Sequence, residues 1–191
     1  MSNYFVKKED VSKYPLIEFN GKTHLIESKQ DVLKYCQIIS KADIVGFDTE
    51  TKPAFEKGVS HSVALIQLSV KNTIFLFRIN KIGLSQKVVD ILSNPSIVKV
   101  GIDIKNDISG LQKIKSFNPA NFIDLNNLAL KNGFKSIGAV KLSIMLLGFR
   151  ISKSQRLSDW SAEKLTPAQI KYAAIDAWIC PKILNALRKK H

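Results

Sequence analysis

Two short apolar runs that end in carboxylates constrain the fold of this chain more than any other feature. Residues 44–47 are followed at once by Asp48 and then by Glu50, and residues 97–102 lead into a turn that carries Asp107. Runs of this length that are rich in β-branched and aromatic residues are typical of buried strands. The sequence therefore predicts a sheet that carries acidic side chains at the ends of two strands.

A further acidic side chain lies in a helical pattern near the end of the sequence. Thr166 is a typical N-cap residue and Pro167 is favoured at the first position of a helix, so we expect a helix that begins there and continues almost to the last residue. Pro181 should kink or break this helix. Tyr172 and Asp176 are four positions apart and therefore share one of its faces.

The other segments predict alternating strands and helices. Asn20 and Gly21 between two apolar runs predict a β-hairpin over residues 16–26, and Ser28 predicts the start of a helix. We expect further strands at residues 63–69, 73–77 and 122–125, and further helices at residues 85–93, 105–115 and 137–147. Strands in an antiparallel meander, followed by strands that alternate with helices, predict the α/β class, with a mixed central β-sheet flanked by α-helices.

The balance of charges predicts a polyanionic partner. The chain has 29 lysines and arginines against 16 aspartates and glutamates, which gives a net charge of +13. A basic surface attracts nucleic acid, although solubility alone also accounts for such a charge. If four of the 16 acids gather in one cleft, the rest of the surface is still more basic, which suits a phosphodiester substrate.

The length of 191 residues suits one domain with a sizeable core. We expect an irregular N-terminal extension over residues 1–15 and a single domain over residues 16–191. No apolar run is long enough to cross a bilayer, and the start of the chain lacks the apolar stretch of a signal peptide. Cys36 and Cys180 fall in helical patterns and are interpreted as small buried hydrophobic residues. We therefore expect a cytoplasmic protein without a membrane partner.

Asp48 and Glu50 are two positions apart on a predicted strand, so both side chains should point to the same face. A rigid pair of carboxylates suits Mg²⁺, which requires oxygen ligands in near-octahedral geometry. The simpler interpretation is a polar strand end, which an Asp-x-Glu pattern alone does not exclude.

The other acids also have two interpretations each. Asp107 falls in the first turn of a predicted helix, where a carboxylate either favours the helix dipole or supports a metal ion. Tyr172 at helical spacing is typical of a core residue, but Asp176 on the same face needs a partner because an unpaired buried carboxylate is costly. A divalent ion held against a phosphate is a common use for converging carboxylates, and it would account for all of them.

In combination, these segments resemble the DEDDy branch of the 3′–5′ exonucleases, and within it the Werner-type exonuclease domain and the ribonuclease D catalytic domain. The matching stretches are residues 45–51, 63–68, 100–107, 157–161 and 165–176. The histidine branch would place a histidine at position 171, where this chain has Lys171 followed by Tyr172. The resemblance implies a ribonuclease H-like fold.

The resemblance also implies a two-metal hydrolysis that releases nucleoside 5′-monophosphates from the 3′ ends of nucleic acid, with Mg²⁺ or Mn²⁺ as the two divalent ions. Asp48, Glu50 and Asp176 would bind the inner ion. Asp48 would bridge to the second ion, which Asp107 would support mostly through water. Tyr172 would orient the attacking water through its hydroxyl, because a tyrosine with an ordinary pKa of about 10 is a poor base.

Four residues near these motifs are candidates for substrate binding. Thr51 and Phe55 follow the first motif, and Phe55 is either a stacking platform for a base or an anchor of its loop. Asn106 belongs to the turn of the second motif. Arg156 lies in the connector before the last helix and would either bind phosphate or tie the connector down. Gln67 is interpreted as a buried polar group of its strand.

Several functions stay open. The main prediction is a 3′–5′ exonuclease with DNA as the favoured substrate, because ribonuclease D proteins usually carry extra helical domains and this chain ends just past its last predicted helix. An RNA-processing exoribonuclease of the ribonuclease D type is the alternative within the class. A non-catalytic nucleic-acid binding module would show a lost acid among the site residues, and none is lost. A phosphatase of small nucleotides would share the metal chemistry.

Overall fold

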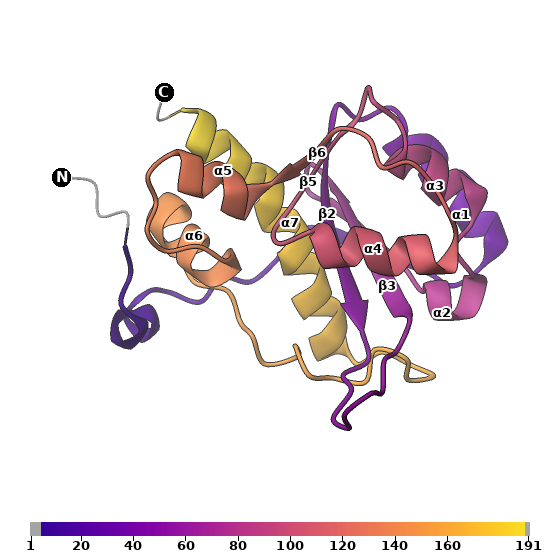
Figure 1. The fold of residues 1–191 in the computed structure, drawn as a ribbon, viewed down its shortest axis with the longest axis horizontal. Coiled ribbons are helices and arrows are strands. Elements are labelled where there is room, and N and C mark those ends of the chain that lie inside the picture. The colour runs from indigo at the N-terminus through magenta and orange to yellow at the C-terminus, as the bar shows by residue number, and fades with distance from the viewer. Residues whose placement is uncertain (1–4, 190–191) are drawn as a thin grey trace.

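A six-stranded sheet forms the centre of the fold in the computed structural model, which describes residues 5–189 (Figure 1). Its strand order is β1-β4-β3-β2-β5-β6. The strands span Lys22–Ile26 (β1), Ile44–Thr51 (β2), Val63–Val70 (β3), Thr73–Phe77 (β4), Val98–Gly101 (β5) and Phe122–Asp124 (β6). β2, β3 and β4 form the predicted antiparallel meander, while β1, β5 and β6 join it in parallel. The prediction of a mixed sheet in an α/β fold is confirmed.

Helices cover both faces of this sheet, as predicted. They span Lys29–Ile39 (α1), Ile79–Ile82 (α2), Gln86–Leu92 (α3), Lys105–Ile114 (α4), Leu125–Lys131 (α5), Ala139–Leu147 (α6) and Pro167–Arg188 (α7). One hydrophobic core lies between the sheet and α1, α3 and α4, and a second lies between the sheet and α5, α6 and α7 (Figure 1). Across residues 5–189, no helix has both the length and the apolar character that a membrane span requires.

The predicted hairpin over residues 16–26 is wrong. Leu16 forms only an isolated bridge with Arg150, and β1 pairs in parallel with β4 instead. A type I′ turn needs positive φ at both central residues, and neither Asn20 nor Gly21 adopts it. Gly21 serves a close approach of two chain segments, because a Cβ atom there would lie 2.3 Å from a neighbouring carbonyl oxygen.

Two shorter segments also differ from the predictions. The part of the predicted irregular extension that the structure describes, residues 5–15, contains a 3-10 helix, η1 (Lys8–Lys13), which contacts α6. The rest of that extension, residues 1–4, lies outside the described residues. The helix α5 begins directly after β6, where only a strand was predicted, because the Asp124 carboxylate caps the first backbone N–H groups of the helix.

The long helix α7 passes through Pro181 without a break, and the sheet supplies the hydrogen bond that the proline removes. Because proline has no backbone N–H, the carbonyl of Ala177 one turn earlier has no helical partner. The hydroxyl of Ser69 in β3 donates to this carbonyl over 2.9 Å. Gly46 in β2 makes room, since a Cβ atom there would lie 2.1 Å from the same oxygen and 2.9 Å from the Pro181 ring. α7 is therefore fastened to β2 and β3 at one point along its length.

The start of α7 is fastened separately. The Thr166 hydroxyl accepts from the backbone N–H of Gln169, and the Gln169 side chain accepts from the backbone N–H of Thr166. Arg78, which is fully buried just after β4, holds the connector that precedes the helix. Its guanidinium pairs with Glu27 at 3.0 Å and donates to the backbone carbonyl of Ala162. These contacts prevent α7 from sliding along the sheet.

Ser69→Ala should lower the free energy of unfolding by about 1–3 kcal/mol, because it leaves the buried Ala177 carbonyl without a donor. In a Pro181→Ala background the same change should cost less, since the restored backbone N–H can donate to that carbonyl. Denaturant unfolding of the four proteins in this double-mutant cycle measures the difference. Equal costs in both backgrounds would show that Ser69 does not replace the hydrogen bond lost at Pro181.

Candidate active site

One face of β2 and β3 is directed toward α7 and carries the polar side chains of the site. Because side chains alternate along a strand, Gly46, Asp48 and Glu50 of β2 all point to this side. The residues opposite them in β3 are, in the same order, Ser69, Gln67 and Leu65. The regular pairing ends at an irregularity between Glu50 and Thr51, directly beyond these side chains. Asp48 and Glu50 therefore share a face, as their spacing predicts.

The helix α7 places Tyr172 and Asp176 over this face. Ala173 and Ala174 between them are buried, and their small side chains allow the helix to approach the sheet closely. The ring of Trp160, which is fully buried in the connector, packs beside that of Tyr172 with 5.9 Å between the ring centroids. The spacing of four residues thus brings a phenol and a carboxylate to the strand that carries the first two acids.

Asp48, Glu50 and Asp176 form the acidic cluster of the site. One carboxylate oxygen from each lies within 4.8 Å of those of the other two. Three oxygens at this spacing can bind a hard divalent cation. Within the described part of the chain, no lysine, arginine or histidine forms a salt bridge with these three residues. The donor set therefore fits a metal ion, which would balance the buried charge.

Burial raises the pKa of each carboxyl group in the cluster. Burial raises the pKa of the Asp48 carboxyl group well above its usual range, and the neighbouring carboxylates raise it further. Burial, followed by the charge of Asp176, raises the pKa of Glu50 to about 9. Burial also raises the pKa of Asp176 to about 7, although a hydrogen bond from Tyr172 and the charge of Lys153 favour its ionised form. Without a cation, the cluster therefore holds protons near neutral pH.

Asp107 stands beside the acidic cluster rather than within it. It lies in the first turn of α4 and accepts a hydrogen bond from the Thr49 hydroxyl, which is on the face of β2 opposite to Asp48. Burial raises the pKa of Asp107 to about 6, and this hydrogen bond opposes the rise. Its charge raises the pKa values of Asp48 and Glu50 in turn, which shows that the groups are close.

Two cavities adjoin the end of β2, one on each side of the strand. The α7 cavity has a volume of about 120 Å³ and is lined by Asp48, Ile102, Ala139, Ile151, Lys153, Arg156, Tyr172, Asp176 and Cys180. The α4 cavity has a volume of about 360 Å³ and is lined by Thr49, Thr51, Ser60, His61, Ser62, Val63, Asn106, Asp107, Ser109, Gly110 and Lys113. Asp48 and Asp176 thus line one of these two neighbouring cavities and Asp107 lines the other.

The predicted substrate-binding residues fall in three places. Arg156 lines the α7 cavity, beside the acidic cluster. Thr51 and Asn106 line the α4 cavity. Phe55 lies in the segment after β2 and is 80% exposed, which favours the stacking platform over the loop anchor. Its ring is accessible to a ligand.

Sequence reasoning missed three basic residues of these cavities. Lys153 lines the α7 cavity, where its ammonium group favours the ionised form of Asp176. His61 and Lys113 line the α4 cavity. For Lys153 the only signal in the sequence is its place three residues before Arg156 in the connector. The other two reach the cavity from a loop and from the end of a helix, and no local pattern marks them.

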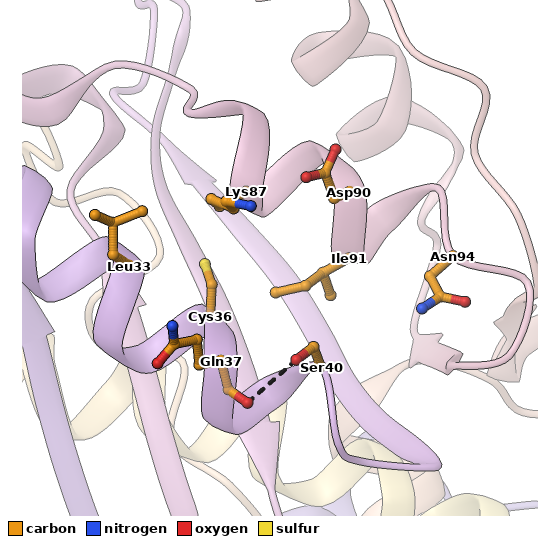
Figure 2. Close-up of a pocket in the computed structure, with 8 residues that line it drawn as sticks. All are labelled: Leu33, Cys36, Gln37, Ser40, Lys87, Asp90, Ile91 and Asn94. Carbon is orange, nitrogen blue, oxygen red and sulfur yellow. Dashed lines mark hydrogen bonds between the residues drawn. The ribbon is translucent and has the colours of Figure 1, made fainter.

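A third cavity, between α1 and α3, lies on the sheet face opposite to α7 (Figure 2). Its volume is about 200 Å³, and its lining residues are Leu33, Cys36, Gln37, Ser40, Lys87, Asp90, Ile91 and Asn94. Burial raises the pKa of the Cys36 thiol to about 12, so this thiol is a poor nucleophile. With Asp90 as its single lining carboxylate, this cavity lacks the converging acids of the α7 cavity.

Without metal, the protein should become less stable as the pH rises from about 5 to about 9. A carboxyl group whose pKa is raised by folding binds its proton more tightly in the folded state. Its contribution to stability is therefore present at low pH and is lost as the pH passes the folded value, about 7 for Asp176 and about 9 for Glu50. Thermal unfolding in a chelator should show a melting temperature that falls by roughly 10 °C over this interval.

Glu50→Gln is the control for this pH dependence, because it removes one of the groups that take up a proton on folding. The melting temperature of this variant should change less steeply with pH. An equally steep change in the variant, or a melting temperature of the unsubstituted protein that does not depend on pH, would contradict the expected proton uptake by the cluster.

Comparisons with known proteins agree with this geometry. The sequence profile of a 3′–5′ exonuclease family matches residues 23–191. The chain is 32% identical to ribonuclease D of Acidiphilium cryptum over 87% of this chain and 42% of the relative. It is 34% identical to the bifunctional 3′–5′ exonuclease/ATP-dependent helicase WRN of Mus musculus over 73% of this chain and 10% of the relative. The chain thus spans less than half of the length of these curated relatives.

Solved structures share the fold. The EXO domain of Aedes aegypti Nibbler superposes with a TM-score of 0.82 at 23% identity, over 93% of this chain and 92% of that one. Escherichia coli RNase D superposes with a TM-score of 0.78 at 24% identity, over 88% of this chain and 46% of that one. At these identities the likeness concerns the fold alone, and it confirms the predicted ribonuclease H-like architecture.

Proposed function

Because the chain belongs to the 3′–5′ exonuclease family, we propose that it hydrolyses phosphodiester bonds at the 3′ ends of nucleic acid and releases nucleoside 5′-monophosphates. The observation that carries this proposal is the acidic cluster of Asp48, Glu50 and Asp176. Two of its members, Asp48 and Asp176, line one cavity together with Tyr172. The net charge of +13 supports a polyanionic substrate.

Two divalent ions, Mg²⁺ or Mn²⁺, are the proposed cofactors. The buried carboxylates offer only hard oxygen ligands, which suit these ions. Asp48, Glu50 and Asp176 would bind one ion. Asp48 would also reach the second ion, and Asp107 would support that ion mostly through water because it stands outside the cluster. Bound ions of this kind would activate the attacking water and stabilise the charge on the leaving oxygen.

Tyr172 acts in this proposal as a hydrogen-bond donor. Burial, and then the nearby carboxylates, raise its pKa above the usual value, so the hydroxyl keeps its proton at neutral pH. The hydroxyl lies close enough to Asp176 to favour the ionised form of that carboxyl group and so lower its pKa. A protonated phenol at this place can orient the attacking water but cannot accept a proton from it. Another acceptor must therefore take that proton.

Lys153 and Arg156 are assigned to the phosphate at the bond that is cleaved. Both line the α7 cavity together with Asp48 and Asp176, so a phosphate beside bound ions would lie within reach of two cationic side chains. Lys52 is paired instead with Asp159 at 3.1 Å. This ion pair links the segment after β2 to the connector and so helps to place the two cations.

The α4 cavity is the proposed site for the nucleotides upstream of the cleaved bond. Its volume of about 360 Å³ and its hydrogen-bonding residues, among them Thr51 and Asn106, suit a sugar and a phosphate. His61 and Lys113 supply groups that can contact the backbone. The exposed ring of Phe55, in the segment after β2, offers a stacking surface for a base.

DNA stays the predicted substrate, with RNA as the alternative. The relatives include both a ribonuclease D and the WRN exonuclease/helicase, so they favour neither. The two neighbouring cavities favour a strand over a mononucleotide, because they lie on both sides of the end of β2. The five acidic and tyrosine residues of the site are all present, which favours an enzyme over a binding module.

The protein should shorten a single-stranded oligonucleotide labelled at its 5′ end, from the 3′ end, in Mg²⁺ or Mn²⁺ and not in chelator. DNA and RNA of one sequence, digested side by side, decide the substrate class. Asp48→Ala and Asp176→Ala should lower the rate by about 100-fold or more, because each removes a proposed metal ligand. Gel electrophoresis of the labelled products gives the rates.

Asp90→Ala is the matched control for these variants, since it removes a carboxylate from the remote cavity between α1 and α3 (Figure 2). It should cleave at the rate of the unsubstituted protein. Undiminished cleavage by Asp176→Ala would refute the assignment of the site. Release of phosphate from mononucleotides without shortening of oligonucleotides would favour a phosphatase.

Lys153→Ala and Arg156→Ala should each weaken inhibition by a nucleoside 5′-monophosphate by about tenfold, because this product carries the phosphate that was cleaved. Inhibition by the matching nucleoside, which lacks the phosphate, should not change. Inhibition constants from initial rates measure both effects. Lys164→Ala removes an exposed positive charge of the same connector and serves as the control. Equal losses for nucleoside and monophosphate would place the two cations elsewhere on the substrate.

A further inference from the structure

Gln67 is a buried polar side chain in the acidic site that has no part in the steps above. It lies directly opposite Asp48 in the β2–β3 pairing and is fully buried. Among residues 5–189, it is the one side chain whose two polar groups are both buried without a hydrogen-bond partner. Each unpaired buried group costs roughly 1–3 kcal/mol. An apolar side chain at this position would therefore give a more stable metal-free fold.

The neighbours of Gln67 on the same strand face show what a purely structural residue does there. Ser69 donates to the Ala177 carbonyl and fastens α7. Leu65 packs in the hydrophobic cluster that contains Tyr172. Gln67 lies between them at the level of the carboxylates and contributes neither a completed hydrogen bond nor an apolar surface. The amide group of Gln67 therefore contributes neither hydrogen bonding nor apolar packing to the fold, and it lies beside the acidic cluster.

The Glu50 carboxyl group is a candidate partner for this amide on the same face of the sheet. Gln67 pairs with Asp48, and Glu50 follows two positions later on the same strand face, so the amide and the Glu50 carboxyl group are diagonal neighbours that form no completed hydrogen bond. An amide that donates to an ionised carboxylate forms a hydrogen bond about twice as strong as one between neutral groups.

We propose that Gln67 is a positioning residue of the cation site, whose amide donates to the Glu50 carboxylate and holds it in the orientation that binds the ion. This inference rests on the proposed function, because it requires that the acidic cluster binds a divalent ion. Hydrogen-bond partners of metal ligands typically change metal affinity by about 10–100-fold. Gln67 thus lowers the stability of the metal-free protein and raises its affinity for the ion.

Gln169 offers a matched control. It is also a buried glutamine, with 5% of its surface exposed, but its polar groups have partners. Its side chain accepts from the backbone N–H of Thr166 and donates to the carbonyl of Asp159. An apolar substitution breaks existing hydrogen bonds at Gln169, whereas at Gln67 it removes unpaired groups. An apolar substitution should therefore stabilise the metal-free protein at Gln67 and destabilise it at Gln169.

Gln67→Leu and the nearly isosteric Gln67→Met should bind Mn²⁺ about tenfold or more weakly than the unsubstituted protein in calorimetric titrations. In chelator, both variants should melt at or above the temperature of the unsubstituted protein, because the unpaired groups are gone. Gln169→Leu should melt at a lower temperature. Neither readout depends on turnover.

Unchanged Mn²⁺ affinity in both Gln67 variants would overturn the inference and leave the proposed function standing. A lower melting temperature of both metal-free variants would also overturn it, since it would show that the amide stabilises the fold. A failure of the unsubstituted protein to bind Mn²⁺ would instead overturn the metal site itself, and the inference with it.

Discussion

The site depends on the packing of α7 against the sheet. Asp48 and Glu50 come from a strand and Asp176 comes from a helix more than 100 residues later, so only the contact between these elements brings the carboxylates together. The close contact is possible because Gly46 has no side chain to keep the helix away. Pro181 has no N–H, so one carbonyl of the helix is left without its helical partner. The hydroxyl of one serine donates to this carbonyl instead. Repulsion among the acids opposes this packing, and the apolar surfaces of the helix and the sheet must outweigh it.

The electrostatics of the site and the stability of the fold make opposite demands. A chain that carries a net charge of +13 leaves the three carboxylates of its acidic cluster without an ion pair in the described residues. It also keeps a buried glutamine whose polar groups are unpaired beside them. Both features cost stability in the absence of a ligand, and in the proposed function both would become favourable on cation binding. Basic residues stand instead where a phosphate would approach, at Lys153 and Arg156.

Local patterns were sufficient for part of this structure. A spacing of two placed Asp48 and Glu50 on one strand face, and a spacing of four placed Tyr172 and Asp176 on one helix face. Their meeting in space followed from the resemblance of the whole set of segments and not from any one spacing. The strands of the meander and the capped start of α7 were also predictable, because their signals lie within a few residues.

The errors and omissions share one physical cause, which is competition from contacts between distant segments. Asn20 and Gly21 favour a local turn, but β1 finds a parallel partner in β4. Pro181 predicts a kink or a break, and the helix does not break there because a hydroxyl from another element satisfies the carbonyl that the proline frees. Lys153 was missed because its local sequence does not distinguish it from a solvated surface lysine. Only the tertiary fold brings it close to Asp176.

The irregular pairing between β2 and β3 begins directly beyond Glu50. Because strand side chains alternate, a slip of one residue within β2 would turn Thr49 toward α7 and both carboxylates away from it. A change of length in residues 52–62 can instead be absorbed at the irregularity, without disturbing the paired part of the strand. Insertions and deletions are therefore tolerable after Glu50, whereas before it they would turn the carboxylates away from α7. The segment after β2 can therefore change in length while the strand that carries Asp48 and Glu50 keeps its register.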